Sequence, residues 1–196
     1  ELAKNANVPN STEDYTISFW MKTNNMNMAN ASVMHLCNFE TGDKLSIAMN
    51  STAFSNNCIQ TISKVDGATT NKSSTVVASS GTWMNIILTV DSGTGTLYIN
   101  GNKSITDISV GDIFTSSNYA MYTGVTDDAM VQYFYTALDE VYLYNGALSE
   151  SEIAILANSG NYNNGDFVTA RITISSNIQS AGTLYGAGDV IIGNEA

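Results

Sequence analysis

The stretch Ala137-Leu-Asp-Glu-Val-Tyr-Leu-Tyr-Asn-Gly-Ala-Leu-Ser-Glu-Ser-Glu-Ile-Ala-Ile-Leu156 decides the fold of this chain. Its first half, Leu138 to Tyr144, is rich in β-branched and aromatic residues and predicts a strand. Strict alternation would place Asp139, Val141 and Leu143 on one face and Leu138, Glu140, Tyr142 and Tyr144 on the other. Both faces carry apolar bulk, so we expect this strand inside a β-sandwich.

The second half of the stretch predicts a short helix near residues 150–157. Asn145-Gly146 ends the strand. Ser149 and Glu152 have the spacing of a capping box, in which each side chain binds the other residue's amide. The helix has one apolar stripe for docking on a sheet, made of Ile153, Leu156 and Ala157.

The rest of the chain reads as a series of short strands separated by Asn, Gly and Ser clusters. We predict strands at residues 15–22, 33–39, 45–49, 58–63, 75–78, 83–90, 96–101, 103–105, 119–125 and 131–135. Strands at this spacing, with almost no helix and a single proline, indicate an all-β antiparallel sandwich.

Three blocks, in the right order, resemble the laminin-G-like jelly rolls of the concanavalin A-like lectin-glucanase superfamily. They are Tyr15-Thr-Ile-Ser-Phe-Trp-Met-Lys-Thr23, the hairpin from Gly81 to Gly101, and Leu138 to Ile153. The resemblance implies an antiparallel jelly-roll β-sandwich over residues 1–160. It does not imply one ligand, because this fold carries many functions.

Residues 161–196 continue the β-pattern as an extension or as the start of a following β module. Asp166-Phe-Val-Thr-Ala-Arg-Ile-Thr-Ile174 alternates strongly, and two further strands are predicted between Ser180 and Ile192. This tail resembles β-segments near the ends of large bacterial surface proteins. Family members usually begin with a strand that this chain lacks, so we expect tail strands to cover the resulting edge, in the same chain or in a neighbouring copy.

Composition limits the partners. The net charge of −11 argues against nucleic acid and anionic lipid and suits cation binding. No apolar run approaches the roughly 20 residues of a membrane span. The polarity comes mainly from Asn, Ser and Thr, because charged residues are only 13% of the chain. We therefore expect a secreted or cell-surface module without membrane insertion.

Cys37 and Cys58 lie about twenty residues apart on nearby predicted strands, and a disulfide between them is the favoured interpretation. The alternative is two buried thiols. The only histidine, His35, is interpreted as a strand residue, and a single histidine leaves no zinc-binding pattern.

The sequence argues against an enzyme. Glycosidases of the superfamily carry a Glu-x-Asp-x-x-Glu strand whose two carboxylates share a face, and this chain has none. Asp139 and Glu140 would point to opposite faces if the strand alternates. One histidine without a supporting motif does not make a nucleophilic triad.

Calcium is the cofactor that the resemblance implies, as a structural or ligand-bridging ion. Asp139 matches the aspartate that opens the family's closing strand and often faces such a site, and Asp127 and Asp128 in the preceding loop are further candidate ligands. The alternative is that Asp127 and Asp128 are solvated turn residues and that Asp139 binds a neighbouring loop.

Aromatic and amide side chains near predicted turns are the candidate ligand-binding residues, because sugar rings stack on aromatic faces and amides bind hydroxyls. They are Tyr119, Tyr122, Tyr133, Phe54, Asn118 and Gln132. Each of the aromatic residues also fits a structural role. Trp20 and Trp83 match core positions of the family and are interpreted as packing residues.

The sequence thus favours a non-catalytic, lectin-like recognition module of a larger bacterial surface protein, which binds a glycan or another cell-surface ligand. The alternative is a structural subunit of a surface filament, which self-associates through an open sheet edge and binds no glycan.

Overall fold

The computed structural model of the 196-residue chain describes residues 14–24, 31–49, 57–114, 118–124 and 136–159. The described elements are β1 (Tyr15–Lys22), β2 (Ala31–Asn38), β3 (Lys44–Met49), β4 (Cys58–Val65), β5 (Ala68–Val77), β6 (Met84–Asp91), β7 (Thr94–Ile99), β8 (Asn102–Ser109), β9 (Tyr119–Thr123), β10 (Ala137–Asn145) and α1 (Glu150–Ser159).

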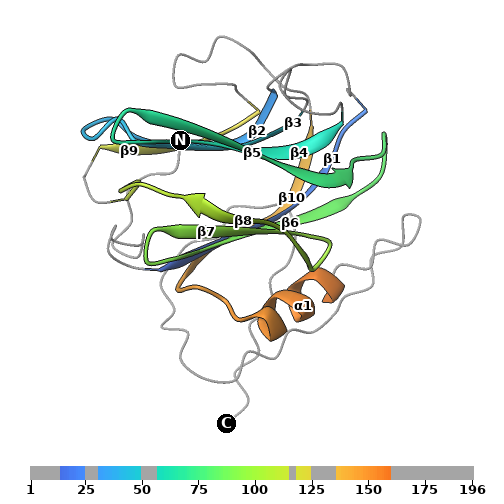
Figure 1. The fold of residues 1–196 in the computed structure, drawn as a ribbon. Helices are drawn as coiled ribbons and strands as arrows, with labels where there is room; N and C mark the ends of the chain where they lie inside the picture. Colours follow the sequence, from blue (N-terminus) through green and yellow to red (C-terminus); the bar gives the residue numbers. More distant parts are fainter. Residues whose placement is uncertain (1–13, 25–30, 50–56, 115–117, 125–135, 160–196) are drawn as a thin grey trace.

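The strands form two stacked five-stranded sheets (Figure 1). Sheet A has the order β10-β1-β6-β7-β8, and sheet B has the order β5-β4-β3-β2-β9. All neighbouring strands run antiparallel. The all-β sandwich predicted from the sequence is confirmed. The strand predicted at residues 131–135 and the β-extension predicted at residues 161–196 lie outside the described residues.

The core lies between the sheets because each strand turns alternate apolar residues inward. From sheet A, Ile17, Phe19, Ile86 and Leu88 are completely buried. They face an equally apolar set from sheet B, which consists of Val33, Met34, Leu36, Leu45, Ile47, Met49 and Ile59. The two sheets are also joined at one side, where the Ser74 and Ser104 hydroxyls lie 2.6 Å apart and the Lys72 ammonium donates to the Thr106 carbonyl at 2.8 Å.

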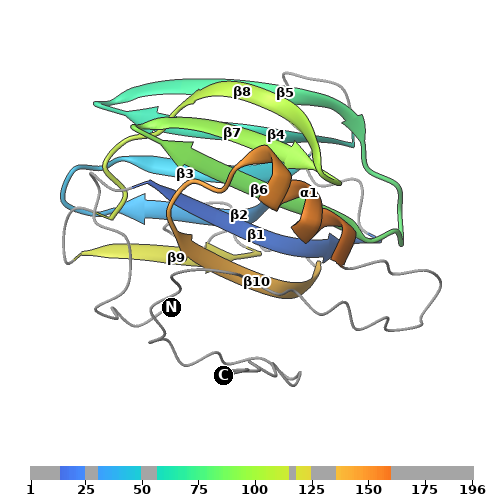
Figure 2. The same cartoon turned by 90° about the horizontal axis from the view of Figure 1, so that it is seen from below.

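Helix α1 covers the outer face of sheet A (Figure 2). Ile153 and Leu156 pack on Ile87 and Tyr98, as the predicted stripe requires. The capping box is also confirmed: the Ser149 N–H donates to Glu152 Oε2 at 2.8 Å, and the Glu152 N–H donates to Ser149 Oγ at 3.4 Å. The Ser149 hydroxyl also donates to Glu152 Oε2 at 2.6 Å, and this hydrogen bond, followed by the one from the Ser149 N–H, lowers the pKa of Glu152. The described part of the chain holds no helix with the length and hydropathy of a membrane span.

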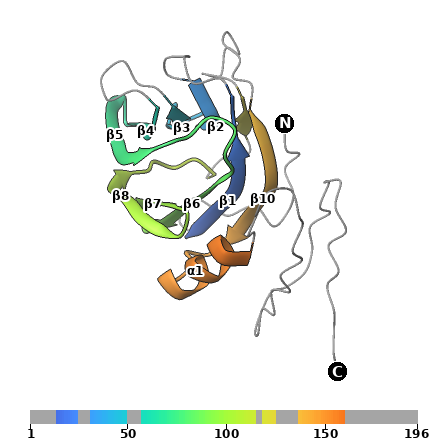
Figure 3. The same cartoon turned by 90° about the vertical axis from the view of Figure 1, so that its right-hand side faces the viewer.

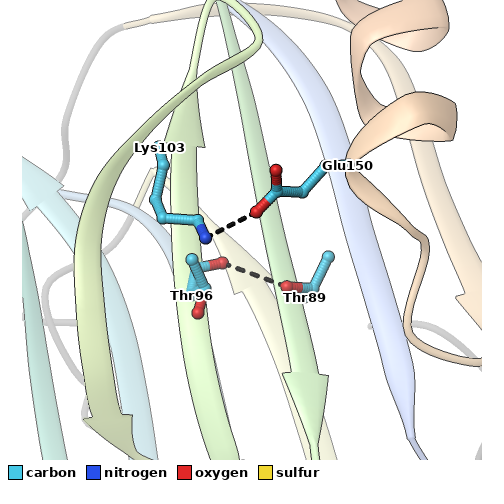
Figure 4. A network of polar contacts seen from close by, with 4 residues as sticks. All are labelled: Thr89, Thr96, Lys103 and Glu150. Atoms are coloured by element: carbon cyan, nitrogen blue, oxygen red, sulfur yellow. Dashed lines mark hydrogen bonds and ion pairs between the residues drawn. The ribbon is translucent and has the colours of Figure 1, made fainter.

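An exposed ion pair fixes the first turn of α1 over β8. The Lys103 ammonium lies 2.6 Å from Glu150 Oε1 (Figure 4). It also lies 6.0 Å from the ring centroid of Tyr98. The hydrogen bond to Glu150, together with the charges of Tyr98 and Glu150, raises the pKa of Lys103. Both side chains are largely exposed, so the pair contributes orientation more than stability.

Three hairpins close through two-residue turns with positive φ at both central residues. These turns are Asp66-Gly67, Ser92-Gly93 and Asn100-Gly101. Such turns match the twist of the strands that they join. The turn at Asp66-Gly67 begins β5 seven residues before the strand predicted at residue 75. That first half of β5 is mostly exposed and polar, so hydrophobic periodicity could not reveal it.

The predicted disulfide is wrong, and the strand register gives the reason. Cys37 pairs with Lys44, which pairs with Lys64. Cys58 is therefore two strands away and six residues further along, a separation of about 20 Å, whereas a disulfide needs Cα atoms within about 7 Å. Both cysteines are buried thiols, which was the alternative interpretation.

A buried carboxylate ties three loops together at one end of the sandwich. Asp43, in the turn between β2 and β3, accepts the Asp66 N–H at 3.1 Å and the Asp112 N–H at 3.0 Å. Asn38 joins the same group by donating from Nδ2 to the Asp112 carbonyl at 2.6 Å. Gly111 leaves room for the carboxylate, since a Cβ at this position would overlap Asp43 Oδ2.

We predict that Gly111→Ala lowers the free energy of unfolding by about 1–3 kcal/mol, because the new methyl group displaces the Asp43 carboxylate from its two amide donors. Urea unfolding measures the loss. In an Asp43→Ala background most of the clashing atoms are gone, so the same glycine substitution should cost much less. Equal costs in the two backgrounds would contradict this interpretation.

An aromatic group near the same end of the core contains two buried hydroxyls. Phe114 packs edge-on against Tyr15 and Tyr119, with ring centroids 5.0 and 5.3 Å away. Neither phenolic oxygen has a hydrogen-bond partner among the described residues. Burial raises the pKa of Tyr15 and of Tyr119, so both hydroxyls are neutral at ordinary pH.

We predict that Tyr15→Phe leaves the chain at least as stable as the parent, because it removes a buried polar atom and keeps the ring against Phe114. Urea unfolding of this variant, and of Tyr119→Phe as a second case, provides the measurement. A loss of more than about 1 kcal/mol would instead mean that the hydroxyl is hydrogen-bonded within the fold.

Candidate functional site

A β-bulge changes the face on which Asp139 lies. Asp139 pairs with Trp20 and Tyr142 pairs with Ser18, so Glu140 and Val141 together oppose the single residue between them in β1. Glu140 adopts a left-handed conformation with φ of +48°. Strict alternation across residues 138–144 is therefore wrong. Asp139 shares the outer face of sheet A with Tyr142 and Tyr144, and Leu138 turns inward with Leu143.

The bulge brings acidic and aromatic side chains together along β10. Asp139, Glu140, Tyr142 and Tyr144 form what we call the β10 patch. Burial and then the charge of Asp139 raise the pKa of Glu140. Burial raises the pKa of Tyr142 and Tyr144, and the charge of Glu140 adds to both shifts. The centroids of the two tyrosine rings lie 6.0 Å apart. The carboxylates and the phenol groups of the patch therefore interact electrostatically.

The fit of the β10 patch to calcium is partial. Asp139 is half-buried, and its Oδ1 accepts the Glu140 N–H at 2.8 Å. Calcium needs six to eight oxygen ligands, and among the described residues no group of three or more His, Cys, Asp or Glu could hold a metal. The other two predicted ligands, Asp127 and Asp128, lie outside the described residues, so the calcium site stays a prediction.

The outer face of sheet B carries a second polar group, centred on His35. The His35 ring stacks on Tyr122 of the neighbouring strand, with centroids 6.4 Å apart and planes 23° apart. On its other side, His35 Nδ1 lies 2.6 Å from the Ser46 hydroxyl. His35 and Ser46 are buried and Tyr122 is half-buried. The stack fixes the orientation of the Tyr122 ring.

Polar side chains continue across this face. The register places side chains from β3, β4 and β5 on the same side as His35, namely the polar Lys44, Ser46, Gln60, Lys64, Asn71 and Ser73 and the apolar Ala48 and Ile62. Ser46 and Gln60 are buried, so the accessible polar groups are the ammonium groups of Lys44 and Lys64, the Asn71 amide and the Ser73 hydroxyl. We call this group, with His35 and Tyr122, the sheet B face.

The structure separates the predicted ligand-binding residues. Tyr122 lies on the sheet B face, whereas Tyr119 pairs with Asn38 on the opposite, inner face and packs against Phe114. Asn118 is exposed just before β9, and its carbonyl accepts the Phe39 N–H at 2.8 Å. Three other predicted residues, Tyr133, Phe54 and Gln132, lie outside the described residues.

The two tryptophans also differ. Trp20 is only 8% exposed, but it pairs with Asp139 on the outer face of sheet A and is not in the core between the sheets. Trp83 is half-buried, with the Lys22 ammonium 4.9 Å from its ring centroid. Both are packing residues, as predicted, but they pack on the outside of a sheet or at its end.

Sequence reasoning missed His35 and Ser46 as members of a site, and Tyr142 and Tyr144 as members of the β10 patch. The signal for the first pair was present, because His35 alternates with the apolar Met34 and Leu36 and therefore must face outward. The signal for the tyrosines was hidden by the bulge, which only the pairing of β1 with β10 reveals.

Comparison with known proteins identifies the fold. A family model described as "Concanavalin A-like lectin/glucanases superfamily" matches residues 2–154. A search of curated proteins finds no match. Among solved structures, the chain is similar to domain 4 of AbnA, a GH43 extracellular arabinanase from Geobacillus stearothermophilus, in complex with arabinotriose. The identity is 22%, the TM-score is 0.63, and the match covers 76% of this chain and 70% of that one.

Two further solved structures share the fold but are longer. The botulinum neurotoxin serotype G binding domain is 16% identical with a TM-score of 0.54, and 79% of this chain matches 38% of its length. Mouse laminin alpha1 chain domains LG4-5 are 9% identical with a TM-score of 0.52, and 71% of this chain matches 38% of theirs.

At these low identities the solved structures show only that the fold is shared. The family model, in contrast, spans more than half of the sequence and both sheets of the structure. The chain belongs to the concanavalin A-like lectin/glucanases superfamily.

Proposed function

We propose that this chain is an extracellular, non-catalytic recognition module that binds carbohydrate on the sheet B face. The observation that carries the proposal is the stack of Tyr122 on His35, which places a half-buried aromatic ring on the same face as the Ser46 hydroxyl and, further across the sheet, the Asn71 amide. Sugars are recognised by this combination, since their apolar faces stack on rings while their hydroxyls donate to and accept from polar groups.

The two outer faces of the sandwich are not equivalent. On sheet A, α1 lies over the outer face (Figure 1). Its residues Ile153 and Leu156 pack on Ile87 and Tyr98. On sheet B, no described helix covers the outer face, which mixes polar side chains with Ala48 and Ile62, and Asn71 at the edge strand is exposed. The sheet B face is therefore the better candidate for a hydrophilic ligand that lies across several strands.

The structural relatives support a binding role. One is an arabinanase domain in complex with arabinotriose, and another is the binding domain of a neurotoxin. At identities of 22% and 16% they say nothing about individual ligand contacts. The superfamily includes glucanases, so the non-catalytic character of this chain is part of the proposal.

The position of the carboxylates relative to the sheet B face supports the absence of catalysis. The two adjacent carboxylates that the bulge brings together, Asp139 and Glu140, lie on the edge strand of sheet A. The sheet B face lies on the other side of the sandwich. A glycan bound there would not reach these carboxylates, whereas a glycosidase needs its carboxyl pair on both sides of the scissile bond.

We predict that Tyr122→Ala weakens glycan binding at least about tenfold, because it removes the ring platform. The ligand is first identified on a glycan array, and affinities are then measured by isothermal titration calorimetry. Tyr142→Ala is the matched control, since it removes a half-buried tyrosine from the outer face of the other sheet.

Two results would contradict the proposal. One is equal weakening by both tyrosine substitutions. The other is release of reducing sugar from the bound glycan that disappears in Glu140→Gln, because this would make the chain an enzyme.

We further propose that calcium binds at Asp139 and stabilises the fold. A site that binds only the native state adds about 2.7 kcal/mol at a calcium concentration a hundredfold above Kd. For a chain of this length that is a rise in Tm of roughly 5–10 °C. We predict this rise in differential scanning calorimetry and its loss in Asp139→Asn. Magnesium serves as the control, because it demands a tighter octahedral site. Equal shifts in the parent and the variant would exclude Asp139 as a ligand.

A further inference from the structure

Strand β10 is the last described strand on one side of sheet A, and the core at this edge is incomplete. The order of the sheet ends at β10, whose described neighbour is β1 (Figure 3). On the inner side, Leu138 and Leu143 are only half-buried although they pack against the core. Val141, in the bulge, is 36% exposed. An added strand with an apolar inner side would complete this part of the core.

The chain itself contains a segment with the required pattern. Beyond Ser159, where α1 ends, 37 residues follow, and residues 168–174 alternate strictly between apolar and polar side chains. One side of a strand formed here would be apolar, with Val168, Ala170, Ile172 and Ile174. The other side would carry Phe167, Thr169, Arg171 and Thr173, and Arg171 is the only arginine in the chain.

We propose that residues 167–174 dock along the open edge of β10 in the same chain, with Arg171 beside Glu140 in the β10 patch. The apolar side then continues the inner face over Leu138, Val141 and Leu143. The alternation places Arg171 on the outer face, where Tyr142 and Tyr144 lie. A guanidinium there binds a carboxylate and stacks on a tyrosine ring at once.

The connection is long enough. A Cβ on Gly101 would lie 2.9 Å from Ala157 Cβ, so the end of α1 reaches the turn between β7 and β8. The Asn100 N–H at this turn donates to the Asn85 carbonyl, Asn85 pairs with Trp20, and Trp20 pairs with Asp139. The turn therefore lies at the same position along the strands as Asp139, at the start of β10. Three to four strand spacings, about 17 Å, separate α1 from the open edge. Residues 160–166 span up to about 23 Å when extended.

Charge favours this occupant over a second copy of β10. Two β10 edges paired antiparallel over residues 137–145 would bring Glu140 of each chain within two residue positions of Glu140 of the other, and like charges this close on neighbouring strands repel. The segment that carries Arg171 has the complementary charge.

The test is hydrogen–deuterium exchange of the full-length chain, read at the amides of β10 and of residues 167–174. In the parent both segments should be protected. Arg171→Glu and Glu140→Arg should each speed exchange in both segments about three- to tenfold, and the double variant should restore the parent rates. Arginine at position 140 is no more strained than glutamate at the same positive φ.

Two matched variants control for the change in net charge. Lys64→Glu and Glu40→Arg make the same charge changes on strand β4 and on the exposed turn after β2. They should leave the exchange of β10 and of residues 167–174 unchanged.

The proposal is overturned if residues 167–174 exchange as fast as an unstructured peptide, or if the double variant exchanges no more slowly than the single ones. It is also overturned if protection rises with protein concentration together with dimer formation in analytical ultracentrifugation, because the segment would then occupy a second copy.

Discussion

The structure depends on the inward alternation of β1. Ile17, Phe19 and Met21 point into the core from the second strand of sheet A, and β1 pairs with β6 on one side and β10 on the other. Its register with β6 is regular throughout, so the apolar residues of both strands stay in phase. Its register with β10 shifts once, and this shift moves Asp139 to the outer face. The position of the acidic side chains is therefore a consequence of how the core is packed.

The local features were predictable from the sequence because they depend on residues close together in the chain. The capping box joins Ser149 and Glu152, and strand β1 has the predicted bounds because its alternation is unbroken. The turn at Asp66-Gly67 has a pattern typical of hairpins and could have extended the prediction of β5. These features need no knowledge of the partner strand.

The features that could not be predicted depend on pairing between distant strands. Tyr119 and Tyr122 look alike in sequence, but their pairing with β2 sends the first into the core and the second to the sheet B face. Cys37 and Cys58 lie on strands that are close in sequence, yet β3 lies between them and the register moves them apart. The candidate site was thus only partly accessible, because strand order and phase decide which side chains meet.

The buried thiols have a consequence for where such a module can fold. Cys37 and Cys58 are held too far apart to be oxidised to an intramolecular disulfide, and neither is on the surface. The sandwich is stabilised by its two packed sheets without a covalent cross-link between them. Its folding is for that reason independent of the redox potential of the compartment. The free energy of folding includes no disulfide bond, in a reducing cytosol as in an oxidising exterior.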